Sequence, residues 1–160
     1  MTGVELARIA VALDGSEYAN HALEFAIDIA RRYSSELQIL SVAPLVPVYV
    51  APAEPWIPAG IPESELAHYR KVVDEAVAKA EKAGLTKVTG LCLEGVIVDE
   101  ILAHVEASPP DLLILGSRGL STAKRLLLGS VSDAVAHHVG CPVLIVRPPR
   151  GKSTTSPRRS

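Results

Sequence analysis

Short apolar runs alternate with amphipathic stretches along most of this chain. Five runs are apolar at most positions, as expected for strands buried on both faces of a sheet: residues 8–13, 37–42, 87–93, 111–115 and 142–146. In four intervening stretches, apolar residues recur at helical spacing: residues 16–32, 64–83, 98–105 and 131–139. This alternation predicts an α/β fold, in which an open parallel sheet is covered by helices on both faces.

Small polar residues and glycines mark the ends of two predicted helices. Ser16 follows Asp14-Gly15 and is expected to be the N-cap of the first helix, because its side chain can accept a backbone N–H of the first turn. Gly84 is expected to end the helix predicted over 64–83.

Two segments do not follow this pattern. The segment from Pro44 to Pro62 contains six prolines, which excludes a regular helix or an inner strand. We expect a long loop there, of the kind that often forms a lid or a contact surface. Residues 149–160 are rich in Ser, Pro and basic residues, so we expect one domain over residues 1–148 and a disordered basic tail. The tail either contacts an acidic partner or is solvated without a role.

Composition and sequence patterns limit the partners and the cellular location that we expect for this chain. The chain has 160 residues, a net charge of −2 and only 4% aromatic residues, which argues against a nucleic-acid partner. No apolar stretch is long enough to span a bilayer and the N-terminus lacks a signal-peptide pattern, so we expect a cytoplasmic protein without a membrane partner. Cys92 and Cys141 form no CxxC pair and are expected to be reduced thiols.

Four glycine and serine positions carry the main chemical signal. The strand over 111–115 runs into Gly116-Ser117-Arg118-Gly119, and Gly129-Ser130 follows nine residues later at the start of a helix. Unpaired N–H groups at a helix N-terminus bind anions, and glycine lets a phosphate approach the backbone. The segment therefore predicts a phosphate-binding cradle, to which the N–H groups of Ser117 and Val131 would also contribute.

Each of these residues has a purely structural alternative. The glycines can serve turn geometry alone, and Ser130 can cap its helix in a capping-box pair with Asp133. Asp14 can stabilise an Asp-Gly turn, or it can contact ribose hydroxyls or a metal ion held by phosphates. Three cations of the segment either neutralise phosphate charge or are solvated: Arg118, Lys124 and Arg125.

Several familiar catalytic patterns are absent from the sequence. It contains no Gly-Lys-Ser/Thr of a Walker loop and no Gly-x-Ser-x-Gly nucleophile elbow. The adjacent pair His137-His138 points in two directions on a helix and is not expected to chelate one metal ion.

The glycine pattern, Gly116-x2-Gly119-x9-Gly129-Ser130, resembles the motif of the ATP-binding subgroup of the universal stress protein family. Residues 11–16, 40–42 and 141–146 resemble further strands of this family, in the same order along the chain. The resemblance implies a Rossmann-like sheet of strand order 3-2-1-4-5. Ligands of such sheets bind where the strand order reverses, which here is between the strands that end at Asp14 and Gly116.

The resemblance also implies residue roles and partners. Gly116 and Gly119 would line the ribose and phosphates, Gly129 and Ser130 would hold phosphate oxygens, and the Val42 main chain would meet adenine beside Ala12. The cofactor would be ATP, with Mg²⁺ or Mn²⁺ near Asp14, and a homodimer would form through Val143 to Arg147.

Three functions remain open at this point. The first is a nucleotide-binding module that signals to an unknown protein partner with weak or no hydrolysis. The second is a nucleotide-independent scaffold of the same fold, and the third is a slow Mg-dependent ATPase.

Overall fold

The computed structural model describes residues 3–45, 60–118 and 128–148. Within these residues, strands and helices follow one another in strict alternation: β1 (Arg8–Leu13), α1 (Glu17–Tyr33), β2 (Glu36–Pro44), α2 (Glu63–Lys82), β3 (Val88–Gly95), α3 (Ile97–Ala107), β4 (Leu112–Gly116), α4 (Ser130–His138) and β5 (Val143–Val146). The predicted loop and tail fall largely or wholly on residues 46–59 and 149–160, outside the described residues.

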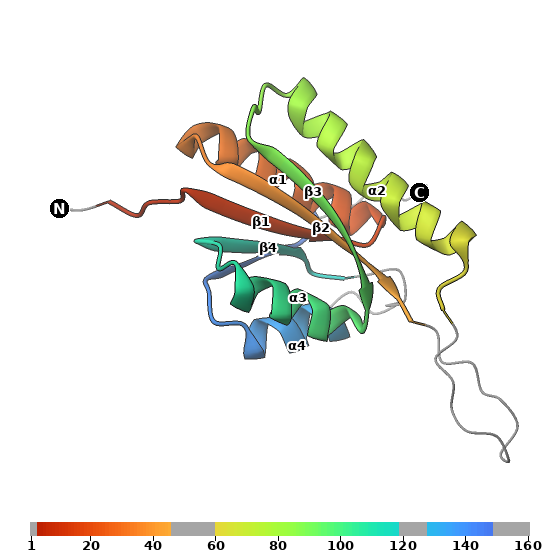
Figure 1. The fold of residues 1–160 in the computed structure, drawn as a ribbon. Helices are drawn as coiled ribbons and strands as arrows, with labels where there is room; N and C mark the ends of the chain where they lie inside the picture. The colour runs from red at the N-terminus through yellow and green to blue at the C-terminus, as the bar shows by residue number, and fades with distance from the viewer. Residues whose placement is uncertain (1–2, 46–59, 119–127, 149–160) are drawn as a thin grey trace, which may run out of the picture.

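The strands form one parallel sheet in the order β3-β2-β1-β4-β5 (Figure 1). This confirms the predicted fold class and strand order. β1 lies in the middle because the chain first winds outward through β2 and β3, and then returns to the other side of β1 with β4 and β5. The order therefore reverses at β1, and the carboxyl ends of β1 and β4 lie side by side there.

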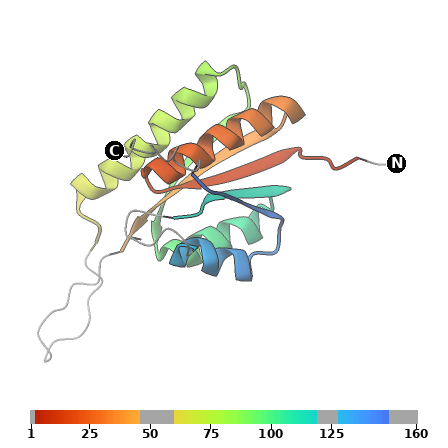
Figure 2. The same ribbon diagram turned by 180° about the vertical axis from the view of Figure 1, so that it is seen from behind.

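Helices cover both faces of the sheet, and each face has its own apolar core. α1 and α2 lie on one face, and α3 and α4 lie on the other (Figure 1, Figure 2). Successive strand residues alternate between the two cores: Ile9 and Val11 pack with α1, whereas Ala10 packs with α3 and α4. Burial on both faces explains why the strands are apolar at nearly every position.

Two strands extend further than the sequence predicts. β2 and β3 remain paired up to Pro44 and Gly95, where the predictions ended at residues 42 and 93. Pro44 is the last residue of its strand, a position at which its missing N–H is tolerated. The extension carries the chain past the carboxyl edge of β1.

α2 packs very closely on β3. A Cβ atom at Gly90 would lie 2.5 Å from Cγ1 of Val73 and 2.7 Å from Cγ2 of Val77, so only glycine fits at this contact. Gly84, with a φ of +98°, directly follows the Ala83 C-cap, as predicted for the end of this helix.

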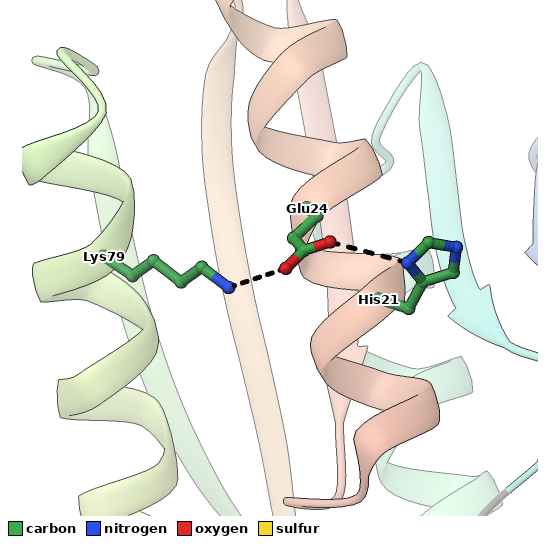
Figure 3. A network of polar contacts seen from close by, with 3 residues as sticks. All are labelled: His21, Glu24 and Lys79. Carbon is green, nitrogen blue, oxygen red and sulfur yellow. Dashed lines mark hydrogen bonds and ion pairs between the residues drawn. The ribbon is translucent and has the colours of Figure 1, made fainter. Parts of the chain in front are cut away.

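An ion network joins α1 to α2 on their solvent side (Figure 3). Glu24 accepts a hydrogen bond from Lys79 at 3.2 Å, and its other oxygen lies 3.5 Å from Nδ1 of His21. The hydrogen bond and the charge of Lys79 lower the pKa of Glu24, with a smaller contribution from His21. A groove of about 390 Å³ lies between the same helices, and its wall includes Lys71, which pairs with Glu75 at 3.6 Å.

Both cysteines are free and partly buried, and burial raises the pKa of each thiol.

No helix of the described residues combines the length and the apolar character needed to cross a membrane.

Candidate functional site at the carboxyl ends of β1 and β4

A crevice of about 110 Å³ lies where the strand order reverses. Its walls come from the ends of β1, β2 and β4 and from the start of α4, with additional side chains from α2 and α3. Eight of the ten predicted site residues line it: Ala12, Asp14, Val42, Gly116, Arg118, Gly129, Ser130 and Val131. The fold thus brings together residues that are up to 119 positions apart in the sequence, from Ala12 to Val131.

Asp14 forms one wall of this crevice from the turn after β1. Its Oδ1 accepts the N–H of Ser16 at 2.9 Å, and Gly15 adopts a φ of +83° between them. The Ser16 hydroxyl then accepts the N–H of Ala19 at 3.1 Å, which confirms the predicted N-cap. Asp14 Oδ2 makes no hydrogen bond with another described residue. The carboxylate therefore stabilises the turn through Oδ1 while it lines the crevice.

The opposite wall is tied together by hydrogen bonds around Ser117. The Ser117 N–H donates to the carbonyl of Val146 at 2.9 Å, and the Ser117 carbonyl accepts the N–H of Gly129 at 2.7 Å. Ser132 Oγ donates to the carbonyl of Gly116 at 2.6 Å. These bonds hold the first turn of α4 against the end of β4.

The same bonds correct two of the predicted roles. The N–H of Ser117 cannot join a phosphate cradle, because it completes the ladder between β4 and β5. Ser117 is only 3% exposed and does not line the crevice. The N–H of Gly129 is likewise occupied, so this glycine contributes open space beside the helix rather than a donor.

α4 begins one residue earlier than predicted, and Ser130 is not its N-cap. Gly129 is the N-cap, with φ −61° and ψ 150°, and its carbonyl accepts the N–H of Asp133 at 2.9 Å. No side chain caps this helix, and Asp133 lies 3.5 Å from His137 instead of reaching back. The predicted capping-box pair is therefore wrong, because the extended Gly129 places Ser130 inside the first turn.

The missing cap leaves donors at the crevice. The backbone N–H groups of Ser130, Val131 and Ser132 precede the first intrahelical bond of α4 and pair with no other described backbone group. All three residues line the crevice. Such donors, together with the positive end of the helix dipole, favour an anion.

Arg118 adds a full positive charge to this wall. It is only 7% exposed, it lines the crevice, and it makes no hydrogen bond or ion pair with another described residue. A largely buried guanidinium is stabilised by an anionic partner, so an arginine in this position fits a site that receives an anionic group.

The remaining walls are apolar and were missed by the sequence analysis. Ile97 and Ile101 of α3 face the crevice one helical turn apart, and Leu115 of β4 lies beside them. Tyr69 of α2 lines the crevice as well. These residues carry the spacing of ordinary core positions, so only the packing of α2 and α3 against the sheet edge identifies them as parts of a site.

Three predicted residues cannot be placed, and no metal site is found among the residues that the structure describes. Gly119, Lys124 and Arg125 fall within residues 119–127, which the structure does not describe. Among the described residues, no group of three or more His, Cys, Asp or Glu side chains is arranged to hold a metal ion. His137 and His138 each place Nδ1 2.8 Å from the backbone carbonyl four residues earlier, so the two rings do not converge.

The family profile of the universal stress protein family matches residues 5–147. The chain belongs to this family. The universal stress protein YxiE of Bacillus subtilis is 33% identical over 148 residues, covering 88% of this chain and 98% of the relative.

Solved structures of the family share the fold. UspA from Lactobacillus plantarum superposes with a TM-score of 0.79 at 24% identity, covering 91% of this chain and all of that one (100%). A universal stress protein solved in complex with cAMP is 28% identical, with a TM-score of 0.66, covering 89% of this chain and 98% of that one.

Proposed function

We propose that this universal stress protein is an ATP-binding module whose nucleotide-bound state is recognised by a partner protein. The observation that carries the proposal is that the largely buried Arg118, which has no ion pair with a described residue, lines the same crevice as Asp14 and as the first-turn N–H groups of α4, which no described backbone group accepts. The family relative solved with cAMP supports an adenine nucleotide as the ligand.

In the proposed complex, each part of the nucleotide binds to one side of the crevice. The phosphates bind the N–H groups of Ser130 and Val131 and the Arg118 guanidinium, and Gly129 leaves room for them. Asp14 binds ribose hydroxyls, or a Mg²⁺ or Mn²⁺ ion that accompanies the phosphates. Adenine lies over Ala12, beside the main chain of Val42 and the apolar side chains of α3.

We propose binding with little or no hydrolysis. Rapid phosphoryl transfer needs an oriented water molecule, a base, and neutralisation of the charge that develops in the transition state. The described part of the crevice supplies anion donors and one carboxylate whose Oδ1 is already bonded to Ser16. These donors and this carboxylate suit a protein that binds a nucleotide reversibly and acts as a sensor of it.

The test is calorimetric titration of ATP into the parent protein and the Gly129→Val variant. A branched side chain at Gly129 would occupy the space beside the unpaired N–H groups, so we expect affinity to fall by at least about tenfold. Gly140→Val is the matched control, because a Cβ at Gly140 meets no atom within 4 Å and this residue does not line the crevice.

Thermal unfolding of each variant verifies its fold, and Arg118→Gln provides a second variant that removes charge instead of adding bulk. Equal affinities of the parent, Gly129→Val and Arg118→Gln would refute the phosphate site. A parent protein that binds no adenine nucleotide would favour a scaffold role instead.

We also propose that two copies of the chain pair through β5. This strand lies at one edge of the described sheet and pairs there with β4 alone. An edge strand presents unpaired N–H and C=O groups that a second chain can bind.

A further inference from the structure

Tyr69 is the one residue of α2 that lines the crevice, as far as the described residues show. It approaches from the face covered by α1 and α2, whereas Ile97 and Ile101 approach from the face covered by α3 and α4. The crevice is therefore bounded by an aromatic ring on one side of the sheet edge and by branched aliphatic side chains on the other.

The surroundings of Tyr69 place it beside the Asp14 turn. The Tyr69 ring makes an edge contact with His68, with ring centres 5.3 Å apart. His68 in turn lies against the turn, since a Cβ at Gly15 would be 3.7 Å from its Nε2. Burial raises the pKa of Tyr69, and the nearby charges of Glu65 and Asp14 raise it further, so the phenol remains a hydrogen-bond donor at neutral pH.

Among the described residues, each polar group of this pair has bonding capacity left over. The Tyr69 hydroxyl makes no hydrogen bond with a described residue, and of the two Asp14 carboxylate oxygens only Oδ1 does so, with the N–H of Ser16. A carboxylate oxygen only accepts, whereas a phenol both donates and accepts. Together they match a pair of neighbouring hydroxyl groups, each of which needs one partner.

We propose that Tyr69 is a specificity-determining residue that recognises one hydroxyl of the ribose while Asp14 binds the other. The inference rests on the proposed function and makes it more specific: the crevice selects ribonucleotides over nucleotides that lack the hydroxyl bound by Tyr69. Gly15, with a φ of +83°, lets this turn lie close to α2, since a Cβ at this position would be 3.1 Å from Cγ2 of Val72.

The test measures dissociation constants for AMP, 2′-deoxy-AMP and 3′-deoxy-AMP with the parent, Tyr69→Phe and Tyr33→Phe. Tyr33→Phe is the matched control, because Tyr33 is 53% exposed at the far end of α1 and does not line the crevice. We expect the parent to prefer AMP over one of the deoxy forms by about tenfold, as a hydrogen bond of ordinary strength allows.

Tyr69→Phe should reduce that preference to about twofold by weakening AMP binding, with the affinity for the same deoxy form unchanged. Tyr33→Phe should retain the full preference. A purely structural role would weaken all three ligands equally and leave the ratios intact, which would overturn the inference while the proposed function stands. A parent that binds none of the three nucleotides would overturn the inference, whereas the proposed function would fall only if the titration with ATP also showed no binding.

Discussion

At the scale of single residues, Asp14 shows how one side chain can be structural and available at once. Its Oδ1 accepts the N–H of Ser16 at 2.9 Å, which fixes the turn after β1, and its Oδ2, which bonds to no described residue, is the oxygen proposed to bind a ligand. The two interpretations offered by the sequence, turn residue and ligand contact, are therefore compatible. The hydrogen bond from Ser16, which belongs to the interpretation as a turn residue, also holds the Asp14 side chain in place at the crevice.

Glu24 carries a prediction about pH. It bridges Lys79 and His21, but its side chain is 56% exposed, so solvent screening limits the contribution of the pair (Figure 3). We expect Glu24→Gln to lower the free energy of unfolding by about 0.5 kcal/mol at neutral pH.

The sign of the pH dependence follows from the lowered pKa of Glu24 in the folded state. The contribution is complete above the ordinary pKa of 4.5 and is lost as the pH falls through the lower folded-state pKa. Urea unfolding of the parent and the variant at neutral pH and near about pH 3 should show the difference shrinking. Glu81→Gln, at an exposed α2 position without an ion pair to a described residue, should show no comparable loss. An acid-independent difference would contradict this explanation.

At the scale of elements, the beginnings of α1 and α4 differ in a functionally important way. α1 has a serine cap that accepts the N–H of Ala19, whereas α4 begins at Gly129 without a side-chain cap. The first turn of α4 contributes Ser130, Val131 and Ser132 to the crevice, whereas the first turn of α1 contributes Ala19, whose N–H is bonded to Ser16. A helix whose N-cap residue has no side-chain acceptor keeps its first backbone N–H groups available to an anion.

Two serine substitutions test this difference. Ser16→Ala should destabilise the protein by about 1 kcal/mol, because the N–H of Ala19 loses its acceptor. Ser130→Ala should change stability by less than about 0.5 kcal/mol, because its side chain caps nothing. Urea unfolding of both variants measures the two effects, and a Ser130→Ala loss as large as that of Ser16→Ala would show that Ser130 is a cap after all.

At the scale of the whole molecule, the strand order produces both the crevice and the exposed edge. The carbonyls of Pro142 and Val146 accept the N–H groups of Leu113 in β4 and of Ser117 directly after it, so the backbone groups of Val143 and Ile145 point to the free side of β5. That row of groups is where a second chain would pair.

The proposed dimer predicts a solution mass of twice 16.9 kDa by light scattering. Ile145→Pro removes one outward N–H without removing a bond to β4, so we expect it to shift the protein toward the monomer. Circular dichroism should show that the variant keeps its secondary structure. A parent mass of one chain, or an Ile145→Pro variant that stays dimeric, would count against pairing through β5.

Hydrophobic periodicity alone predicted the secondary structure and the fold class. Buried strands must be apolar at nearly every position, and surface helices must show a 3.6-residue period. Both patterns can therefore be recognised within a short stretch of the sequence. The Ser16 cap and the Gly84 stop are local in the same way, and both were predicted correctly. The glycine spacing and the resemblance that it carries pointed to the strand order and to half of the crevice residues.

Tertiary structure decided which backbone groups remain free and which helices complete the walls. Whether the N–H of Ser117 is available depends on Val146, 29 residues further along the chain, and that pairing exists only in the assembled sheet. Tyr69, Ile97 and Ile101 have the spacing of core residues, and they become site residues because α2 and α3 pack at the edge where β1 and β4 end. Local patterns determine elements, whereas contacts between elements determine which donors, charges and side chains a ligand would meet.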